Sequence, residues 1–233
     1  MDERHHRDIH GGGARAAVFG VSDGLVSNIS LVLGIAGASV NGTVVRLAGL
    51  AGLLGGAFSM AAGEYISMRA QRELFERELE IERRELERSP RGELRELTRL
   101  YEERGMPPAL AKSVAEQMMA NPELALETHA REELGITADS VGNPMEAALS
   151  SFVMFALGAL IPLLPFLFIR SGHSATLVAV VLAGAAALVV GGLLAIFTER
   201  NWWFSAIRQL AICTIAGAAT YGIGHAIGVS GVG

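Results

Sequence analysis

The sequence has very little cysteine, and it has no surplus of positive charge. The only cysteine among its 233 residues is Cys213, which lies in an apolar run. A single thiol can form no intramolecular disulfide, and it fits no cysteine-based metal motif. The formal net charge of −5 gives no reason to expect a nucleic-acid partner.

Charge is scarce outside one central stretch, and the N-terminus lacks an apolar segment. Charged residues crowd into residues 69–146 of a chain that is 51% hydrophobic and 18% charged, with a mean hydropathy of +0.38. This uneven distribution is typical of a membrane protein with one water-facing domain. Residues 1–7 are polar and do not form the core of a cleavable signal peptide, so we expect the first span to stay in the mature protein.

Five long apolar runs predict five transmembrane helices in an all-α membrane protein. The runs cover residues 14–40, 43–68, 145–169, 175–198 and 205–227. We therefore predict four parts, which are a polar tail (1–13), helices 1 and 2 (14–69), a helical metal-binding domain (70–143), and helices 3 to 5 (144–233). His5, His6 and His10 of the tail could bind metal loosely, but a disordered tail is the favoured interpretation.

The distribution of arginine and lysine predicts the orientation in the membrane. Five spans place the two termini on opposite sides. Nearly all basic residues belong to the N-terminal tail, the inserted domain and the connector at 199–203, whereas the other side has Arg46 and Arg170. The positive-inside rule then places the inserted domain in the cytosol and the C-terminus outside.

The first two spans each contain an acidic side chain, Asp23 and Glu64. An ionisable group within a membrane span is expensive unless it has a function, so two of them suggest a cation site between the spans. Asp23, Ser27 and Ser30 share one helical face, which we expect to line a cavity or to meet another helix. Glycine pairs four residues apart predict close helix packing nearby, at Gly20/Gly24 and Gly52/Gly56.

Two methionines flank the second acid at helical spacing. Met60, Glu64 and Met68 are four residues apart and form one stripe on the helix. Methionine at this spacing is more often part of a core than a ligand. With a carboxylate between the two thioethers, however, a site for a divalent transition metal becomes plausible.

Two pairs of glutamates in the inserted domain have a spacing that suits metal binding. Glu82 and Glu85 are three residues apart, as are Glu93 and Glu96, so each pair lies on one side of a helix. Ser89-Pro90 predicts a break, with the serine as N-cap and the proline as the first helical residue. The two helices can fold back there, and four clustered carboxylates would suit a hard or borderline divalent ion.

The same region also has a simpler interpretation. Arginines alternate with the acids, and spacing alone favours a salt-bridged, solvated helix. The arginines concerned are Arg72, Arg77, Arg83, Arg84 and Arg88. Met118 and Met119 with Glu123 offer a further mixed set of ligands, although methionine is also an ordinary gap filler.

Four motifs together resemble the vacuolar iron transporter family. They are Val-Ser-Asp-Gly-Leu-Val-Ser-Asn (21–28), Phe-Ser-Met-Ala-Ala-Gly-Glu-Tyr-Ile-Ser (58–67), Asn-Pro (143–144) and Gly-Ala-Leu-Ile-Pro-Leu-Leu-Pro (158–165). The resemblance extends from about Ala14 to the end of the fifth span. It implies five spans per protomer, a homodimer, and movement of ferrous iron, often also manganese, out of the cytosol in exchange for protons.

The resemblance also implies roles for individual residues. Asp23, Met60 and Glu64 would line the translocation path. The cytosolic helices of the family bind metal through paired glutamates and through a Met-Met near a further glutamate. The residues that match this pattern are Glu82, Glu85, Glu93, Glu96, Met118, Met119 and Glu123. Nothing in the chain resembles the ferritin-like domain that some relatives carry.

From the residues and the resemblance together we predict a proton-coupled exporter of Fe²⁺, with Mn²⁺, Zn²⁺ and Co²⁺ as alternative ions. Its expected partners are divalent metal ions, protons, the lipid membrane and a second copy of the chain. We expect no enzyme activity and no prosthetic group. The membrane would be the cell membrane in a prokaryote or the vacuolar membrane in a eukaryote. Two alternatives remain, a membrane-anchored iron-binding or sensing protein without transport, and a structural bundle with a solvated charged region.

Overall fold

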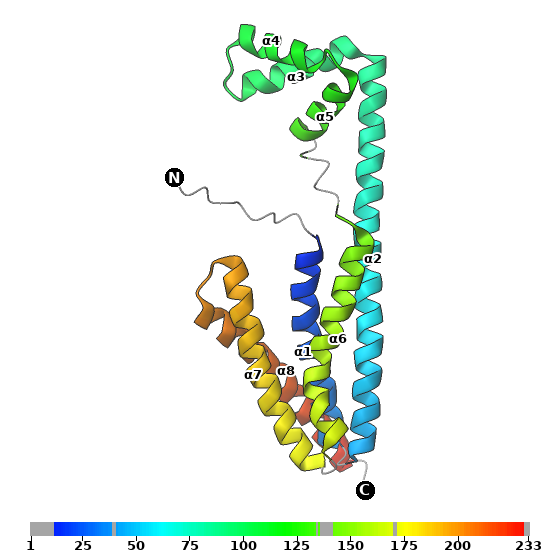
Figure 1. Cartoon of the computed structure of the whole chain (residues 1–233), viewed down its shortest axis with the longest axis vertical. Helices are drawn as coiled ribbons and strands as arrows, with labels where there is room; N and C mark the ends of the chain where they lie inside the picture. Colours follow the sequence, from blue (N-terminus) through cyan, green and yellow to red (C-terminus); the bar gives the residue numbers. More distant parts are fainter. Residues whose placement is uncertain (1–11, 39–40, 134, 136–141, 170–171, 231–233) are drawn as a thin grey trace. The chain divides into compact units, whose positions relative to one another are not determined.

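The structure is a computed structural model that describes residues 12–38, 41–133, 135, 142–169 and 172–230. The described residues form eight helices and no strand (Figure 1). In chain order the helices are α1 (Gly12–Ala38), α2 (Gly42–Arg88), α3 (Pro90–Glu103), α4 (Pro108–Met118), α5 (Pro122–Glu132), α6 (Pro144–Phe168), α7 (Gly172–Thr198) and α8 (Trp202–Ser230). The three histidines of the N-terminal tail and Arg170 lie outside the described residues.

Five of these helices are long and apolar enough to cross a membrane, which confirms the predicted number of spans. They are α1, α2, α6, α7 and α8. The candidate spans other than α2 have 24 to 27 residues. At a rise of about 1.5 Å per residue, helices of this length match a hydrocarbon core of roughly 30 Å. The chain is therefore a multi-pass membrane protein.

The chain divides into two compact units. The first consists of residues 11–66 and 143–233 and contains the apolar helices, and we call it the membrane unit. Residues 67–142 belong to the second, which we call the inserted unit. Helix α2 is continuous from Gly42 to Arg88 and contributes to both, because no proline interrupts it before Ser89-Pro90.

Small residues let the helices of the membrane unit approach closely. A Cβ atom at Gly24 of α1 would lie 2.1 Å from the carbonyl oxygen of Phe155 in α6, and one at Gly158 would lie 2.2 Å from the carbonyl oxygen of Val21. Farther along α1, a Cβ at Gly37 would lie 2.5 Å from the carbonyl oxygen of Tyr221 in α8. Helix α1 therefore packs backbone to backbone against two helices, as the predicted glycine contact requires.

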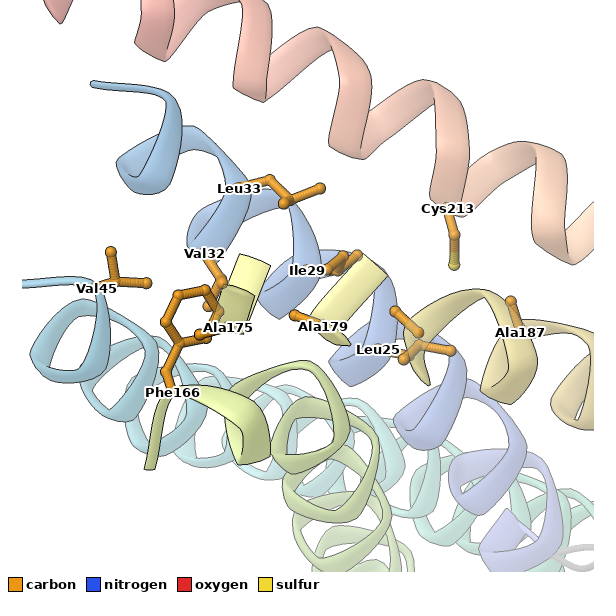
Figure 2. Packing of buried hydrophobic residues seen from close by; sticks show 11 residues of the cluster. Leu25, Ile29, Val32, Leu33, Val45, Phe166, Ala175, Ala179, Ala187 and Cys213 are labelled. Atoms are coloured by element: carbon orange, nitrogen blue, oxygen red, sulfur yellow. The ribbon is translucent and has the colours of Figure 1, made fainter. Parts of the chain in front are cut away.

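The apolar core of the membrane unit surrounds α1. Leu25, Ile29 and Val32 of α1 are buried together with Phe166 of α6 and a row of alanines on α7 (Figure 2). Figure 2 shows the Phe166 ring near Val32, with Val45 of α2 beside it. The single cysteine, Cys213 of α8, is buried in the same cluster and contributes as a small apolar side chain.

The inserted unit has a small core between α3 and α4. Leu97 and Tyr101 pack against Ala111 and Ala115, and the partly buried Met118 and Met119 pack against this cluster. Pro90 begins α3 and Ser89 is its N-cap residue, as predicted, although the serine side chain makes no capping hydrogen bond. Asn121 does cap α5, because its Oδ1 accepts hydrogen bonds from the backbone N–H groups of Glu123 and Leu124.

Candidate metal centre

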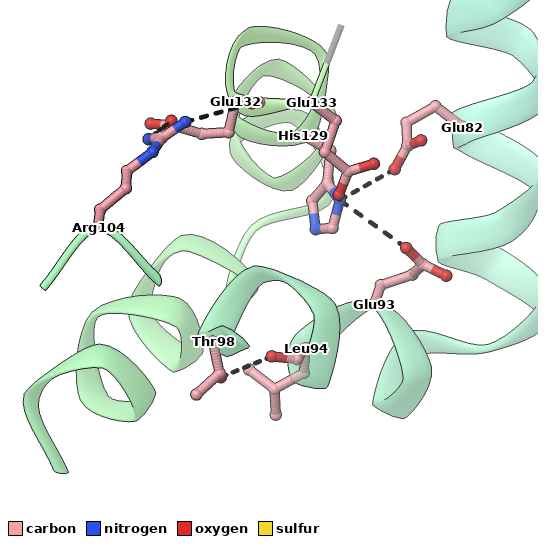
Figure 3. A network of polar contacts seen from close by, with 8 residues as sticks. All are labelled: Glu82, Glu93, Leu94, Thr98, Arg104, His129, Glu132 and Glu133. Atoms are coloured by element: carbon pink, nitrogen blue, oxygen red, sulfur yellow. Dashed lines mark hydrogen bonds and ion pairs between the residues drawn. The ribbon is translucent and has the colours of Figure 1, made fainter. Parts of the chain in front are cut away.

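Three helices of the inserted unit bring carboxylates to one buried histidine (Figure 3). His129 of α5 has its Nδ1 2.9 Å from Glu133 Oε1, 3.1 Å from Glu82 Oε1 and 3.8 Å from Glu93 Oε2. Glu82 comes from the end of α2 and Glu93 from the first turn of α3. The break at Ser89-Pro90 thus brings the two glutamates to one place, and α5 adds the imidazole, with Glu133 as its C-cap residue.

These side chains are held out of water. The side chain of His129 is 0% exposed, and those of Glu82, Glu93 and Glu133 are 6%, 11% and 21% exposed. Buried carboxylates are costly unless a cation or hydrogen bonds compensate their charge. One imidazole among three carboxylates provides at most one positive charge, so the cluster is suited to an additional cation.

The environment raises the pKa of two of these carboxyl groups. Burial raises the pKa of Glu82 from 4.5 to about 7, and the negative charge of Glu133 adds to this effect. Burial likewise raises the pKa of Glu93, with a further contribution from the neighbouring Glu96, while His129 acts in the opposite direction. Burial therefore favours the protonated form of both carboxyl groups, and Glu82 can exchange its proton for a cation near neutral pH.

The hydrogen bonds of the cluster are incomplete. Nδ1 of the imidazole can carry one proton, and Glu133 is its hydrogen-bond partner. Glu82 Oε1 and His129 Nε2 are buried, and neither has a hydrogen-bond partner among the described residues. A metal ion bound at Nδ1 would use the ring as a neutral ligand and would also satisfy the oxygen of Glu82.

Two overlapping sets of groups have the spacing of metal ligands. One is Glu82, His129 and Glu133, and the other is Glu93, Glu96 and Glu133, with ligand atoms within 4.8 Å of one another in each set. Carboxylate oxygens with one imidazole nitrogen suit borderline divalent ions such as Fe²⁺, Mn²⁺ and Zn²⁺.

The other predicted ligands of this unit lie elsewhere. Glu85 is exposed on α2 and belongs to neither set, although its charge raises the pKa of Glu82 slightly. Met118 and Met119 pack against the α3–α4 core. Glu123 is exposed in the first turn of α5, where its backbone N–H donates to Asn121. The structure thus brings together Glu82, Glu93 and Glu96 from the predicted residues.

The salt-bridged interpretation is correct for the exposed acids of the same region. Arg69 pairs with Glu73, Arg72 with Glu76, and Arg99 with Glu103, each four residues apart. Their side chains are about half exposed or more. Alternating charge therefore describes the outer faces of α2 and α3, while the acids at the inner face form the buried cluster.

Sequence reasoning missed His129 and Glu133. His129 lies in the last turns of α5 and Glu133, four residues later, is its C-cap, so the two side chains lie on one side of the helix in the same way as the glutamate pairs. This helical spacing of a histidine and a glutamate is the feature of the sequence that could have predicted them as ligands. The sequence pattern had instead placed the further ligands at Met118, Met119 and Glu123.

The membrane unit contains a second candidate site, a cleft of about 260 Å³ between α1, α2 and α6. Asp23 and Met60 both line it, together with Ser27, Asn28 and Ser59. Ser27 Oγ donates a hydrogen bond to Asp23 Oδ1 at 2.8 Å, which orients the carboxylate. Glycine keeps the cleft open, because a Cβ at Gly56 would lie 2.3 Å from the ring of Phe155.

The remaining polar side chains of α1 have separate partners. Ser22 Oγ accepts a hydrogen bond from Gln209 of α8 at 2.8 Å, and Ser30 Oγ donates to the carbonyl oxygen of Val26 in its own helix at 2.7 Å. Asp23 and Ser27 thus share the cleft as expected, whereas Ser30 is not among its lining residues.

Glu64 lies outside the lining of this cleft. Its Oε2 is 3.3 Å from Nη2 of Arg15 on α1, and its side chain is 14% exposed. The ion pair supplies the compensation that a carboxylate requires in an apolar helix. Met68, the third residue of the predicted stripe, belongs to the inserted unit.

A family model described as VIT family matches residues 14–225. The chain is 38% identical to "Vacuolar iron transporter" of Acanthamoeba castellanii over 96% of its own length and 83% of that protein. It is 31% identical to "Vacuolar iron transporter 1" of Oryza sativa, over 96% and 90% of the two chains, and 30% identical to the Arabidopsis thaliana protein of that name, over 93% and 88%.

Proposed function

Because the chain belongs to the VIT family, we propose that it transports divalent iron through the membrane unit after capture by the inserted unit. The cleft that Asp23 shares with Met60 is the observation that carries this proposal. A carboxylate inside an apolar helix bundle is costly, and a cation that passes through the bundle would compensate its charge. A thioether beside it adds affinity for a transition metal over Mg²⁺ or Ca²⁺.

The buried cluster of the inserted unit is the proposed capture site. Its ligands are Glu82, Glu93, Glu96, His129 and Glu133, and Glu85 contributes negative charge nearby. Net negative charge attracts the ion, and the imidazole gives the site its preference for borderline metals. Capture would raise the occupancy of the transporter when the free ion is scarce.

Protons are the proposed counter-ion. Protonation of a carboxylate removes the charge that binds the metal, so a proton arriving from the opposite side would release the ion. Asp23 is the proposed group in the cleft. Glu64 would join it after leaving Arg15. The guanidinium of that ion pair is about half exposed, and exposed ion pairs are weak.

Export from the cytosol is the proposed direction. It rests on the positive-inside rule, because the inserted unit is rich in arginine whereas Arg46 and Arg170 are the basic residues expected on the other side. Capture by an inserted unit in the cytosol would load the transporter from that side.

A homodimer is the proposed assembly. Leu47, Leu54 and Phe58 are 63%, 52% and 65% exposed. Their spacing of seven and four residues places them on one stripe of α2. A second copy packed on this stripe would cover the apolar side chains.

Flux through reconstituted vesicles tests the proposal. We expect vesicles containing the full chain to move Fe²⁺ under anaerobic conditions, faster when the side receiving the ion is acidic. Asp23→Asn keeps an oxygen to accept from Ser27 but removes the charge, so the rate should fall to about one tenth or less. Glu127→Gln, an exposed change on α5, is the control. Tight binding of Fe²⁺ without flux would instead identify a sensing or storage protein.

A further inference from the structure

Asn28 has a buried oxygen that no described residue uses. The residue is 1% exposed, lies on α1 and lines the cleft that contains Asp23 and Met60. Its Nδ2 donates a hydrogen bond to the backbone carbonyl oxygen of Ala159 in α6 at 2.6 Å. Its Oδ1 has no hydrogen-bond partner among the described residues. A buried amide oxygen without a partner is costly and calls for an explanation.

The hydrogen bond fixes which end of the amide faces the cleft. A backbone carbonyl can only accept, so the nitrogen of Asn28 must face Ala159 and the oxygen must face the other way. The oxygen faces α2, because a Cβ built on Gly52 would lie 3.1 Å from it. Gly52 also lines the cleft. The α1–α6 contact therefore aims a fixed, neutral oxygen at the space beside Asp23.

We propose that Asn28 Oδ1 is a ligand of the ion passing through the cleft and that it favours Fe²⁺ over softer ions such as Cd²⁺. This inference rests on the proposed transport function. An amide oxygen is a hard ligand, whereas the Met60 thioether is a soft one, so the two together define an intermediate preference. The amide adds no charge. Asp23 is the one carboxylate among the described residues that line the cleft, so the amide increases the number of ligands without making the ion harder to release.

Replacement of Asn28 by leucine tests the ligand role. Asn28→Leu has a similar volume but offers no oxygen, and we expect the KM for Fe²⁺ in vesicle flux to rise about tenfold. The KM for Cd²⁺ should change much less, because Met60 remains. Ser151→Ala is the matched control. The Ser151 hydroxyl is also buried and has no hydrogen-bond partner in the described part of the chain, but Ser151 is not among the residues lining the cleft. An equal change for both ions would show that Asn28 only holds α1 against α6 and would overturn the proposal.

A second variant fills the space beside Asn28 Oδ1 and leaves the hydrogen bond from Asn28 to Ala159 in place. The Cβ of Gly52→Ala would contact Asn28 Oδ1 and would lie 2.3 Å from Leu31 Cδ2, so a movable side chain must also shift. We expect the same loss of preference for Fe²⁺. Gly55→Ala, on the same helix with nothing within 4 Å of its Cβ, should behave like the unaltered protein. If Asn28→Leu does not fold, this pair decides the question.

Replacement of Asn28 by aspartate distinguishes the effect of the ligand oxygen from the effect of charge. Asn28→Asp keeps an oxygen in the cleft and adds a carboxylate, so both KM and the maximal rate for Fe²⁺ should fall while the preference over Cd²⁺ persists. Loss of that preference would contradict a ligand role. Absence of flux in the unaltered protein would overturn the transport function itself, and retained preference in Asn28→Leu would overturn only the present inference.

Discussion

At the scale of single residues, His129 determines what the inserted unit can bind. Its ring is fully buried and its Nδ1 faces Glu82, Glu93 and Glu133. Carboxylates alone would serve Mg²⁺ or Ca²⁺ as well as a transition metal. The imidazole shifts the cluster toward Fe²⁺, Mn²⁺ and Zn²⁺.

Removal of this ring should weaken metal binding at the cluster. We expect His129→Ala to lower the Zn²⁺ affinity of the full chain in detergent by about tenfold or more, because one ligand is lost. The measurement is competition with a coloured chelator. Glu127→Gln lies on the same helix and is exposed, so its affinity should equal that of the unaltered protein. Equal affinities for His129→Ala and Glu127→Gln would contradict a ligand role for the ring.

The raised pKa of Glu82 gives the metal-free protein a particular dependence on pH. The folded-state pKa of about 7 lies above the ordinary value of 4.5, so the folded state holds this proton more tightly than the unfolded chain. The resulting stabilisation is complete below pH 4.5 and is lost as the pH rises through 7. We expect the Tm of the chelator-treated protein, measured by circular dichroism, to fall as the pH is raised from 5 to 8.

Glu82→Gln should remove much of that shift, because the amide does not titrate. Glu87→Gln, an exposed neighbour on α2, should retain it. A metal ion opposes the trend, since it binds the deprotonated carboxyl groups, and metal affinity should rise over the same pH interval. A shift that is the same in both variants would assign the titration to another group.

The sequence predicted part of this cluster for physical reasons that can be stated. Glu82, Glu93 and Glu96 have helical spacing beside a Ser-Pro break, and such local patterns survive folding. Which helix packs over them depends on contacts between α3 and α5 that no local pattern reports. His129 therefore escaped prediction. Met118 and Met119 have ligand chemistry, but at the end of α4 they pack against the α3–α4 core.

At the scale of elements, glycine determines how closely α1 and α6 approach. Carbonyl groups of α6 lie where side chains on α1 would otherwise be, and the same contact positions Asn28 against Ala159. Inside a membrane the packing of small residues, rather than exclusion of water, holds helices together. The cleft beside Asp23 therefore depends on this contact.

A methyl group at the contact should separate the two helices. The Cβ of Gly24→Ala would lie 2.1 Å from the backbone oxygen of Phe155, which cannot move without its helix. We expect a loss of about 1–3 kcal/mol, as is usual for overpacking, seen as earlier thermal unfolding in detergent. Gly63→Ala has nothing within 4 Å of its Cβ and serves as the control. Equal stability of both variants would argue against the close α1–α6 contact.

The number and approximate bounds of the apolar helices could be predicted because length and hydropathy are enough to define a span. The sequence predicted only some of the polar groups of α1 that line the cleft. Asp23 and Ser27 were expected together from helical phase, and they line the cleft. Ser30 has the same phase, but its hydroxyl bonds within its own helix, and Asn28 takes a place in the cleft that phase alone does not assign.

At the scale of the whole molecule, the membrane unit leaves a stripe of α2 uncovered. Leu47, Leu54 and Phe58 are more than half exposed within the protomer. The apolar exterior of a membrane protein can face lipid or a second copy, and chemical cross-linking distinguishes the two. The sparse use of cysteine makes this practical, because Cys213→Ala gives a chain without thiols.

A cysteine on the stripe should be captured by the partner protomer. In the Cys213→Ala background, we expect Leu54→Cys to form a covalent dimer with a short bis-maleimide in native membranes. Leu193 is 51% exposed and lies on α7, which is separate from α2 over most of its length in Figure 1, so Leu193→Cys should remain monomeric. Monomers from both variants would argue against dimerisation through this stripe.

The carboxylate of Glu133 belongs to both ligand sets of the inserted unit. It cannot serve two ions independently, so the first equivalent of metal should bind tightly and alter the ease with which the second follows. A titration should then show unequal steps rather than one smooth saturation. Replacement of this single side chain should make the two steps independent of each other and weaken both, because the remaining ligands no longer share a group.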